Sequence, residues 1–186
     1  MMDIDIDKID FKLDWPIIGR LKDDLYPYEG YDHIRYTARG LIENKKGQFV
    51  FLHIVGEDLF GERDHLETCG GGLEEMETLD DALIREVREE LGHEIHGIEL
   101  IGSIVDTYNL IGRITLSTFF HAYLEEEQEQ LKRTEEEQIL IKEIVCLDPL
   151  QALDRLEHQA VHKVDQLVQR RDALALRYYL EHKGII

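Results

Sequence analysis

The chain has 186 residues, of which 43% are hydrophobic, and a formal net charge of −19 at pH 7. A chain of this length and composition is expected to form a single domain with its own apolar core. The acidic balance disfavours a nucleic-acid backbone or an anionic membrane surface as partner, because phosphate contacts need lysine and arginine. It would also repel a phosphorylated small molecule unless a divalent cation mediated the contact.

The first eleven residues, MMDIDIDKIDF, have neither the basic start nor the apolar stretch of a signal peptide. No apolar run has the length that is needed to span a bilayer. The two cysteines, Cys69 and Cys146, lack the spacing of a disulfide framework or a zinc site. We therefore expect a reducing, cytoplasmic location.

The first part of the chain is expected to contain an arm, a hairpin and a loop. Residues 1–30 form the arm, which we expect to be loosely organised and packed on the domain. Residues 34–42 and 48–55 have strand composition and are separated by the turn ENKKG, which predicts a hairpin. A loop over residues 56–64 and a short strand over residues 66–69 then lead to three glycines.

A helix is predicted to follow the glycine turn at residues 70–72. Thr78 is a suitable N-cap, with Asp81 in the capping-box position, and Gly92 lies where a helix normally ends. Apolar residues recur at every fourth position between these caps, at Leu79, Leu83, Val87 and Leu91. This spacing places them on one face, which we expect to pack on a sheet.

Three further strands are predicted, over residues 98–105, 114–124 and 139–147. The charged segment 125–138 between the last two is expected to be a mobile loop or a frayed helix. From Pro149, a residue suited to the first helical position, the pattern is helical to the end of the chain and is long enough for two helices. Their apolar face is expected to pack on the sheet, and a homodimer contact is the alternative.

Residues 70–93, GGGLEEMETLDDALIREVREELGH, carry the strongest indication of function. Glu86, Glu89 and Glu90 stand at positions i, i+3 and i+4 of the predicted helix, so their side chains share one stripe. Three like charges at this spacing repel one another unless they are solvated or bind a cation. Carboxylate oxygens suit hard cations, so the pattern predicts a Mg²⁺ site, with Mn²⁺ as a substitute.

This segment resembles the Nudix box, in which glycine is followed at fixed spacings by glutamate, arginine and three further glutamates. Every specified position matches except the last, where His93 replaces an apolar residue. The resemblance implies an α+β fold in which a mixed β-sheet is sandwiched between helices, in α/β/α order. It further implies a core over residues 31–148, with the box at 71–93, and C-terminal helices of the same domain over residues 149–186.

The resemblance also assigns roles within the box. It implies that the metal is held by the backbone carbonyl near Gly70 and by the carboxylates of Glu86, Glu89 and Glu90. We expect Glu86 and Glu90 to be the principal ligands, with Glu89 as a third ligand or as the base. Arg85 is expected to orient carboxylates, and Glu77 to have a structural role.

Residues outside the box are candidates for completing the site. The family often adds one acidic group from elsewhere, for which the candidates are Glu135, Glu136 and Glu137. The candidates for contacts with substrate are Arg39, Arg63, Arg113 and Tyr108. For the arginines the alternative is surface pairing with acidic residues, and for Tyr108 it is packing in the core or at its rim.

The leading hypothesis is therefore a Mg²⁺-dependent hydrolase that cleaves the diphosphate linkage of a small nucleoside diphosphate derivative. An isopentenyl-diphosphate isomerase is the first alternative, because Cys69-Gly70 lies where that family carries its cysteine. Against it, the box keeps all its glutamates, and Trp15 in the arm is the only tryptophan. A non-catalytic nucleotide sensor with the same fold is the second alternative. The sequence leaves the substrate, the identity of the base and the oligomeric state open.

Overall fold

The computed structural model describes residues 4–128, 131–158 and 160–186. Within them the strands are β1 (Ile17–Leu21), β2 (His33–Glu43), β3 (Phe49–Asp58), β4 (Gly61–Gly72), β5 (His93–Tyr108), β6 (Arg113–Gln128) and β7 (Ile141–Leu147). The helices are α1 (Leu79–Leu91), α2 (Glu135–Leu140), α3 (Pro149–His158) and α4 (Lys163–His182), with short 3₁₀ turns at Ile6–Lys8 and Asn109–Ile111.

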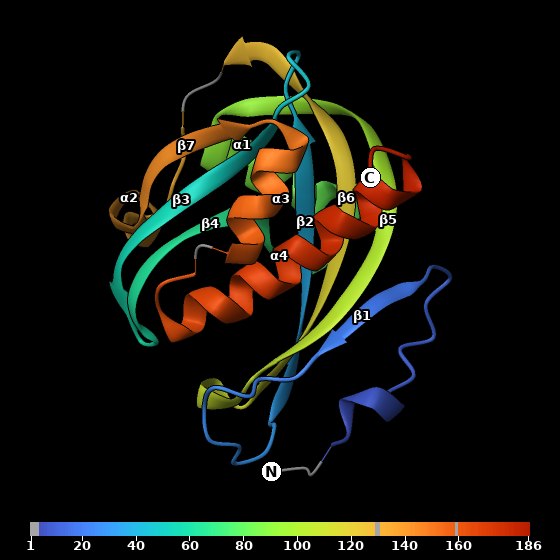
Figure 1. Cartoon of the computed structure of the whole chain (residues 1–186), viewed down its shortest axis with the longest axis vertical. Helices are drawn as coiled ribbons and strands as arrows, with labels where there is room; N and C mark the ends of the chain where they lie inside the picture. Colours follow the sequence, from blue (N-terminus) through green and yellow to red (C-terminus); the bar gives the residue numbers. More distant parts are fainter. Residues whose placement is uncertain (1–3, 129–130, 159) are drawn as a thin grey trace.

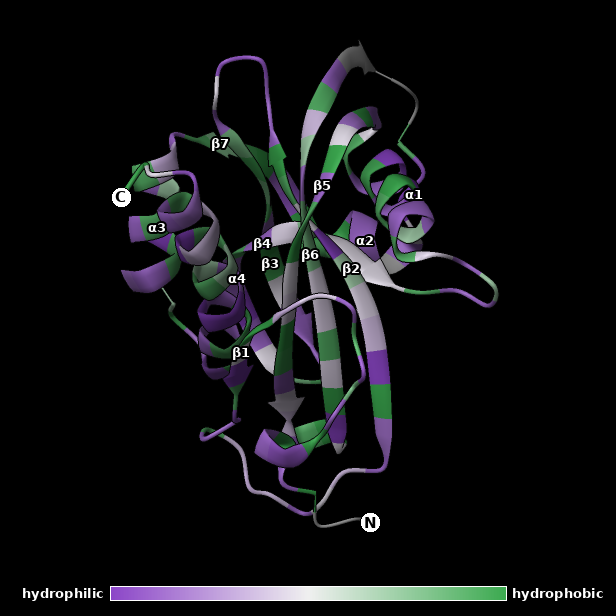
Figure 2. Cartoon of the chain, turned by 90° about the vertical axis from the view of Figure 1, so that its right-hand side faces the viewer, coloured by the Kyte–Doolittle hydropathy of each residue, from purple (hydrophilic) through white to green (hydrophobic). Residues whose placement is uncertain are grey.

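The strands form a mixed sheet in the order β1-β5-β6-β2-β4-β3-β7. At its centre β2 is parallel to β6 and antiparallel to β4. The helix α1 covers one face of the sheet, while α3 and α4 cover the other (Figures 1 and 2). The fold class expected from the sequence, a mixed sheet between helical layers, is confirmed.

The helix of the glutamate-rich segment has the caps that the sequence predicts. The Thr78 side chain accepts a hydrogen bond from the Asp81 backbone, and Gly92 ends α1 with a left-handed φ of 71°. Leu83, Val87 and Leu91 are buried against the sheet in one apolar cluster. Because these residues recur at every fourth position on one stripe, Glu86 and Glu90 fall on the neighbouring stripe of α1.

The predicted loop over residues 56–64 is wrong. β3 continues to Asp58 and β4 begins at Gly61, so the two strands form a long hairpin with only two residues between them. The tip of this hairpin is rich in charged residues, so it lacks the apolar alternation from which a strand is recognised. Gly70, Gly71 and Gly72 are also not a turn, because they pair with β2 as the end of β4.

The charged segment before β7 contains more regular structure than expected. β6 extends to Gln128, and Thr134 caps α2 through a capping box with Glu137. The backbone at residues 129–130 lies outside the described residues. The two C-terminal helices are confirmed, and Pro149 is the first residue of α3. Their predicted apolar face is only partly buried, since Leu150 and Val161 are exposed.

The N-terminal arm is better ordered than the expected loose organisation. β1 pairs in parallel with β5 at the edge of the sheet, and Ile6 is buried in an apolar cluster with Val105 and Ile114. Arm residues therefore contribute directly to the sheet and its core.

No helix in the described part of the chain is long and apolar enough to cross a membrane.

Candidate active site

The carboxylate stripe of α1 lies against the last residues of β4. Glu86 and Glu90 are buried, with 8% and 7% of their surface exposed. A Cβ atom at Gly71 would lie 2.2 Å from Oε1 of Glu86, and one at Gly70 would lie 2.2 Å from the Ala38 carbonyl oxygen. Glycine at these two positions therefore lets the Glu86 carboxylate approach the strand and the strand approach β2.

Glu90 is held by two donors from β4. Its Oε2 atom accepts hydrogen bonds from the Cys69 thiol at 2.8 Å and from the Gly70 backbone N–H at 2.9 Å. Burial and, to a smaller extent, the neighbouring charge of Glu86 raise the pKa of Glu90 to about 8, against the opposing effect of these hydrogen bonds. A buried carboxylate of this kind is stabilised in its charged form by a bound cation.

Glu137, on α2, joins Glu86 and Glu90 in one carboxylate cluster. One oxygen from each of the three side chains lies within 4.8 Å of the others. The box residue Glu89 is not part of this cluster, although its charge acts on Glu86. Of the other loop candidates, Glu135 is exposed, and the side chain of Glu136 lies outside the described residues. An all-oxygen set fits a hard divalent cation such as Mg²⁺ or Mn²⁺.

Arg85 connects the carboxylates of the box. It forms a bidentate pair with Glu77, at 2.8 Å and 2.9 Å, and donates to the Gly72 carbonyl oxygen at 3.0 Å. Its remaining nitrogen lies 2.8 Å from Oε1 of Glu86 and 3.3 Å from Oε2 of Glu89. Arg85 thus fixes Glu86 and Glu89 relative to the end of β4.

A cavity of about 330 Å³ opens beside the carboxylate cluster and includes all the candidate substrate residues. Arg39 lies there, 2.6 Å from Glu67, and Arg63 lies 2.9 Å from Asp58. Tyr108 is 3% exposed, so little of its ring is available for stacking on a substrate. All three candidate arginines therefore line the cavity, and Arg39 and Arg63 also have the acidic partners that the alternative predicted.

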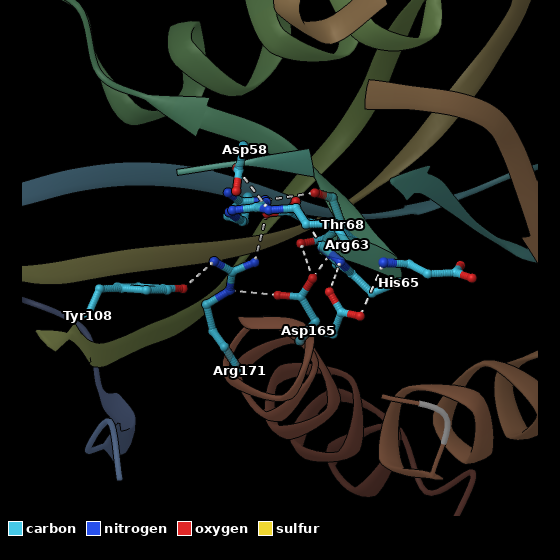
Figure 3. Close-up of polar contacts among 11 residues, drawn as sticks. Asp58, Arg63, His65, Thr68, Tyr108, Asp165 and Arg171 are labelled. Carbon is cyan, nitrogen blue, oxygen red and sulfur yellow. Dashed lines mark hydrogen bonds and ion pairs between the residues drawn. The ribbon is translucent and has the colours of Figure 1, made fainter. Parts of the chain in front are cut away.

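A buried polar network behind the cavity is absent from the sequence-based prediction (Figure 3). Arg171 of α4 is 3% exposed and contacts Asp172 at 2.7 Å, Glu67 at 3.2 Å and the Tyr108 hydroxyl at 3.4 Å. Asp172 also accepts a hydrogen bond from the Thr68 backbone at 2.7 Å. Only the polar QRRD run in the middle of α4 signals this network, and by itself such a run is typical of an exposed helix face.

His65 joins β4 to α4 in the same network. It is 2% exposed, and its Nδ1 atom lies 2.8 Å from Asp165 while Nε2 lies 3.6 Å from Glu67. Burial alone would lower the pKa of His65, but the hydrogen bond to Asp165 and the negative charges of Glu67 and Asp165 outweigh it and raise the pKa above 6.5. The pKa values of both carboxyl groups are lowered, so they stay charged while the imidazole titrates.

The stabilisation from His65 is expected to depend on pH. A group whose pKa is raised on folding stabilises fully below its unfolded pKa and loses this contribution as the pH rises through the folded value. We expect His65→Gln to lower the free energy of unfolding more at pH 5.5 than at pH 9, as measured by urea denaturation. The exposed His158→Gln serves as the control, and an equal loss for His65→Gln at both pH values would contradict the assignment.

Comparisons with known proteins identify a matching family model and similar folds. The model of a family described as NUDIX domain matches residues 33–170. An RNA pyrophosphohydrolase of Marinomonas sp. (strain MWYL1) is 31% identical over 71 residues, which cover 38% of this chain and only 40% of that protein. The fold resembles a NUDIX hydrolase from Nitrosomonas europaea (TM-score 0.61, 20% identity, 82% of this chain and 90% of that chain). It also resembles a MutT protein from Methanosarcina mazei Go1 (TM-score 0.57, 18% identity, 84% and 99%).

Proposed function

We propose that this chain, which belongs to the Nudix family of hydrolases, cleaves the diphosphate linkage of a nucleoside diphosphate derivative in a Mg²⁺-dependent reaction. The observation that carries the proposal is that the carboxylate cluster of Glu86, Glu90 and Glu137 and several arginines line the same cavity. Carboxylates bind a cation, and the cation together with the arginines binds phosphates. A cavity with both kinds of group in its lining therefore suits a diphosphate compound.

The residues of the cluster would hold the cation. Glu86, Glu90 and Glu137 supply oxygen ligands, and the Cys69 and Gly70 donors fix Oε2 of Glu90 so that its other oxygen is free to coordinate. A divalent cation bound there would neutralise charge on the diphosphate and activate water as the nucleophile. In such a reaction the protein contributes mainly positioning and charge neutralisation.

Glu89 is our candidate for the base. Its side chain is 32% exposed, so it has access to solvent, and Arg85 holds it beside Glu86. A carboxylate in this position is able to accept a proton from the attacking water. Arg85 is a positioning residue in this scheme, and Glu77 secures Arg85 through the bidentate pair.

The chain is proposed to act as one unit on a small molecule. Residues 1–30 and 149–186 contribute β1, α3 and α4 to the same sheet and cores as the central segment 31–148, which supports a single domain. The name of one relative includes RNA, whereas the charge of −19 disfavours binding along a nucleic-acid backbone. Homodimer formation stays a prediction.

No observation favours the isomerase alternative. Cys69, on which that reaction would depend, is completely buried, and burial raises the pKa of its thiol well above the usual value. Its thiol donates to Glu90, so its place is beneath the carboxylate cluster. A thiol with these properties is a poor group for proton transfer to an alkene.

A panel of diphosphate compounds tests the proposed function. The protein is incubated with nucleoside triphosphates, sugar nucleotides and dinucleotides in Mg²⁺, in Mn²⁺ and in EDTA, and phosphate is measured after a phosphatase step. We expect hydrolysis of at least one compound with either cation and none in EDTA. Failure to hydrolyse any compound with either cation, or full activity in EDTA, would contradict the proposal.

Glu137 provides a matched pair of variants for the same assay. Glu137→Gln removes a cluster carboxylate, whereas Glu135→Gln changes an exposed residue in the same turn of α2. Loss of one ligand is expected to raise the Mg²⁺ concentration for half-maximal activity by about tenfold or more, because mutation of the groups that merely orient metal ligands already lowers metal affinity by about tenfold. The control should match the wild type, and an unchanged Mg²⁺ requirement in Glu137→Gln would remove Glu137 from the cluster.

A further inference from the structure

The cavity that holds the carboxylate cluster is also lined by basic side chains. Beyond the carboxylate cluster, five arginines line it among the residues that the structure describes: Arg35, Arg39, Arg63, Arg113 and Arg171. The whole chain has 21 basic against 40 acidic residues, so this concentration of arginine runs against its composition. An arginine-rich surface in an acidic protein is suited to an anion.

Three of these arginines already have carboxylate partners. The pairs are Arg39 with Glu67 at 2.6 Å, Arg63 with Asp58 at 2.9 Å, and Arg171 with Asp172 at 2.7 Å. Such pairing neutralises most of their charge and fixes the side chains. These three therefore shape the wall of the cavity and contribute little free positive charge.

Arg35 and Arg113 differ from the other three. Neither guanidinium forms an ion pair with a residue in the described parts of the chain, and the buried Nε of Arg113 has no hydrogen-bond partner there. Arg113 lies over the Tyr108 ring, 4.7 Å from its centroid. The charge of buried Asp106 acts on Arg113 without a direct contact between them.

The two unpaired arginines lie close together and beside the carboxylate cluster. Arg35 of β2 pairs with Thr115 of β6, two residues from Arg113, so both side chains leave the same face of the sheet. A Cβ atom at Gly72 would lie 2.8 Å from Nη2 of Arg35, while one at Gly71 would lie 2.2 Å from Glu86. The Arg35 guanidinium therefore lies against Gly72, and the Glu86 carboxylate lies against the preceding residue of β4, Gly71.

Two neighbouring cations that lack a direct ion pair are unfavourable, and the cost increases with burial. Partial desolvation lowers the pKa of both guanidinium groups, and the charge of Arg39 on Arg35, and of Arg35 on Arg113, lowers them further. The charges of Glu86 on Arg35 and of Asp106 on Arg113 oppose this shift in pKa only in part. An anion between them would remove this repulsion and provide the missing hydrogen-bond acceptors. The arrangement is therefore incomplete without a negatively charged ligand.

We propose that Arg35 and Arg113 bind an anionic group of the substrate that lies outside the scissile diphosphate, and that this group is a further phosphate. The proposal deepens the proposed function and rests on it for the role in catalysis. Such a site would favour nucleoside triphosphates over dinucleotides, because the only phosphates of a dinucleotide are those of the scissile bridge. Arginine is suited to this role because its planar fork binds phosphate oxygens in pairs.

Anion binding by the metal-free protein tests the site independently of any hydrolysis. Binding of inorganic pyrophosphate is measured by calorimetry in EDTA, so the carboxylate cluster cannot contribute through a cation. We expect Arg35→Gln/Arg113→Gln to weaken binding by about tenfold or more, the loss typical of charge-assisted hydrogen bonds. The control Arg177→Gln removes a surface arginine that pairs with Glu157, and its affinity should match the wild type.

Kinetics with two substrates distinguishes this proposal from the proposed function. For a nucleoside triphosphate, the double variant should raise KM by about tenfold with a small change in kcat, because uniform binding is lost. For a dinucleotide with a diphosphate bridge, KM should stay within about twofold. Arg35→Gln alone, at an exposed residue, should show part of the effect and is the variant to use if the double variant has a lower melting temperature.

The measurements distinguish failure of the anion site from failure of the proposed hydrolase function. Weaker pyrophosphate binding in the double variant, in a protein that hydrolyses no diphosphate compound, would sustain the anion site and overturn the proposed function. Hydrolysis with wild-type pyrophosphate binding and wild-type KM values in the double variant would sustain the function and overturn the anion site. No pyrophosphate binding by the wild type would overturn the anion site as well.

Discussion

Replacing Glu90 with glutamine is expected to abolish hydrolysis without destabilising the fold. The change keeps the shape of the side chain and leaves an oxygen that accepts the Gly70 N–H, but it removes the negative charge from the cluster. Loss of several kcal/mol of cation-mediated stabilisation corresponds to a decrease in kcat of about a thousandfold or more. Steady-state kinetics at saturating Mg²⁺ measures this loss.

The stability of the same variant provides a second readout. Burial raises the pKa of Glu90 to about 8 in the metal-free protein, against about 4.3 in an unfolded chain. The folded state therefore binds more protons between these values, and the free energy of unfolding falls as the pH rises through this window. Without this titration, Glu90→Gln should gain stability relative to the metal-free wild type between pH 5 and pH 9.

The exposed Glu75→Gln is the control for both measurements, because it makes the same chemical change on the loop before α1. It should match the wild type in kcat and in the pH dependence of unfolding. If Glu90→Gln retained wild-type turnover, or if it lost stability relative to the metal-free wild type as the pH was raised, the proposed role of this carboxylate would be wrong.

Replacing Gly71 with alanine is expected to impair the site through Glu86. The new Cβ would lie 2.2 Å from Oε1 and 2.5 Å from Cδ of Glu86, so the carboxylate must move away from the strand. A displacement of about 1 Å in a catalytic group costs about a hundredfold in rate. We expect a loss of this size in kcat, with a parallel loss in Mn²⁺ affinity measured by titration.

A double-mutant cycle shows whether Gly71→Ala acts through Glu86. Once Glu86→Gln has removed the carboxylate charge, adding Gly71→Ala should weaken Mn²⁺ binding little further, because both changes affect the same ligand. Independent, additive losses of Mn²⁺ affinity would show that the glycine has another role. Thermal melts of all three variants accompany the titrations, so that a loss of folding is recognised separately.

The sequence identifies the parts of this protein that depend on local regularity. The caps at Thr78 and Gly92 and the four-residue apolar spacing define α1, because helix ends and helix faces depend on neighbouring residues. The strand composition of residues 34–42 likewise corresponds to β2. The projecting tip of the β3–β4 hairpin is missed because its residues are charged and bury no apolar face.

The sequence predicts the site residues only where they belong to one helix. Glu86, Glu89 and Glu90 share a stripe by spacing alone, whereas the approach of Glu137 depends on how α2 packs beside α1. The position of Arg171 likewise depends on the packing of α4 against β4. Contacts across such distances in the chain follow from tertiary packing, which no local pattern encodes.

The most direct test of the central claim is to locate a Mn²⁺ ion in crystals of the protein by anomalous scattering, with a non-hydrolysable nucleotide analogue present. The account predicts a peak within coordination distance of carboxylate oxygens from Glu86, Glu90 and Glu137, and no peak in crystals of Glu90→Gln. An ion bound elsewhere in the cavity, or none near these three side chains at saturating Mn²⁺, would contradict it.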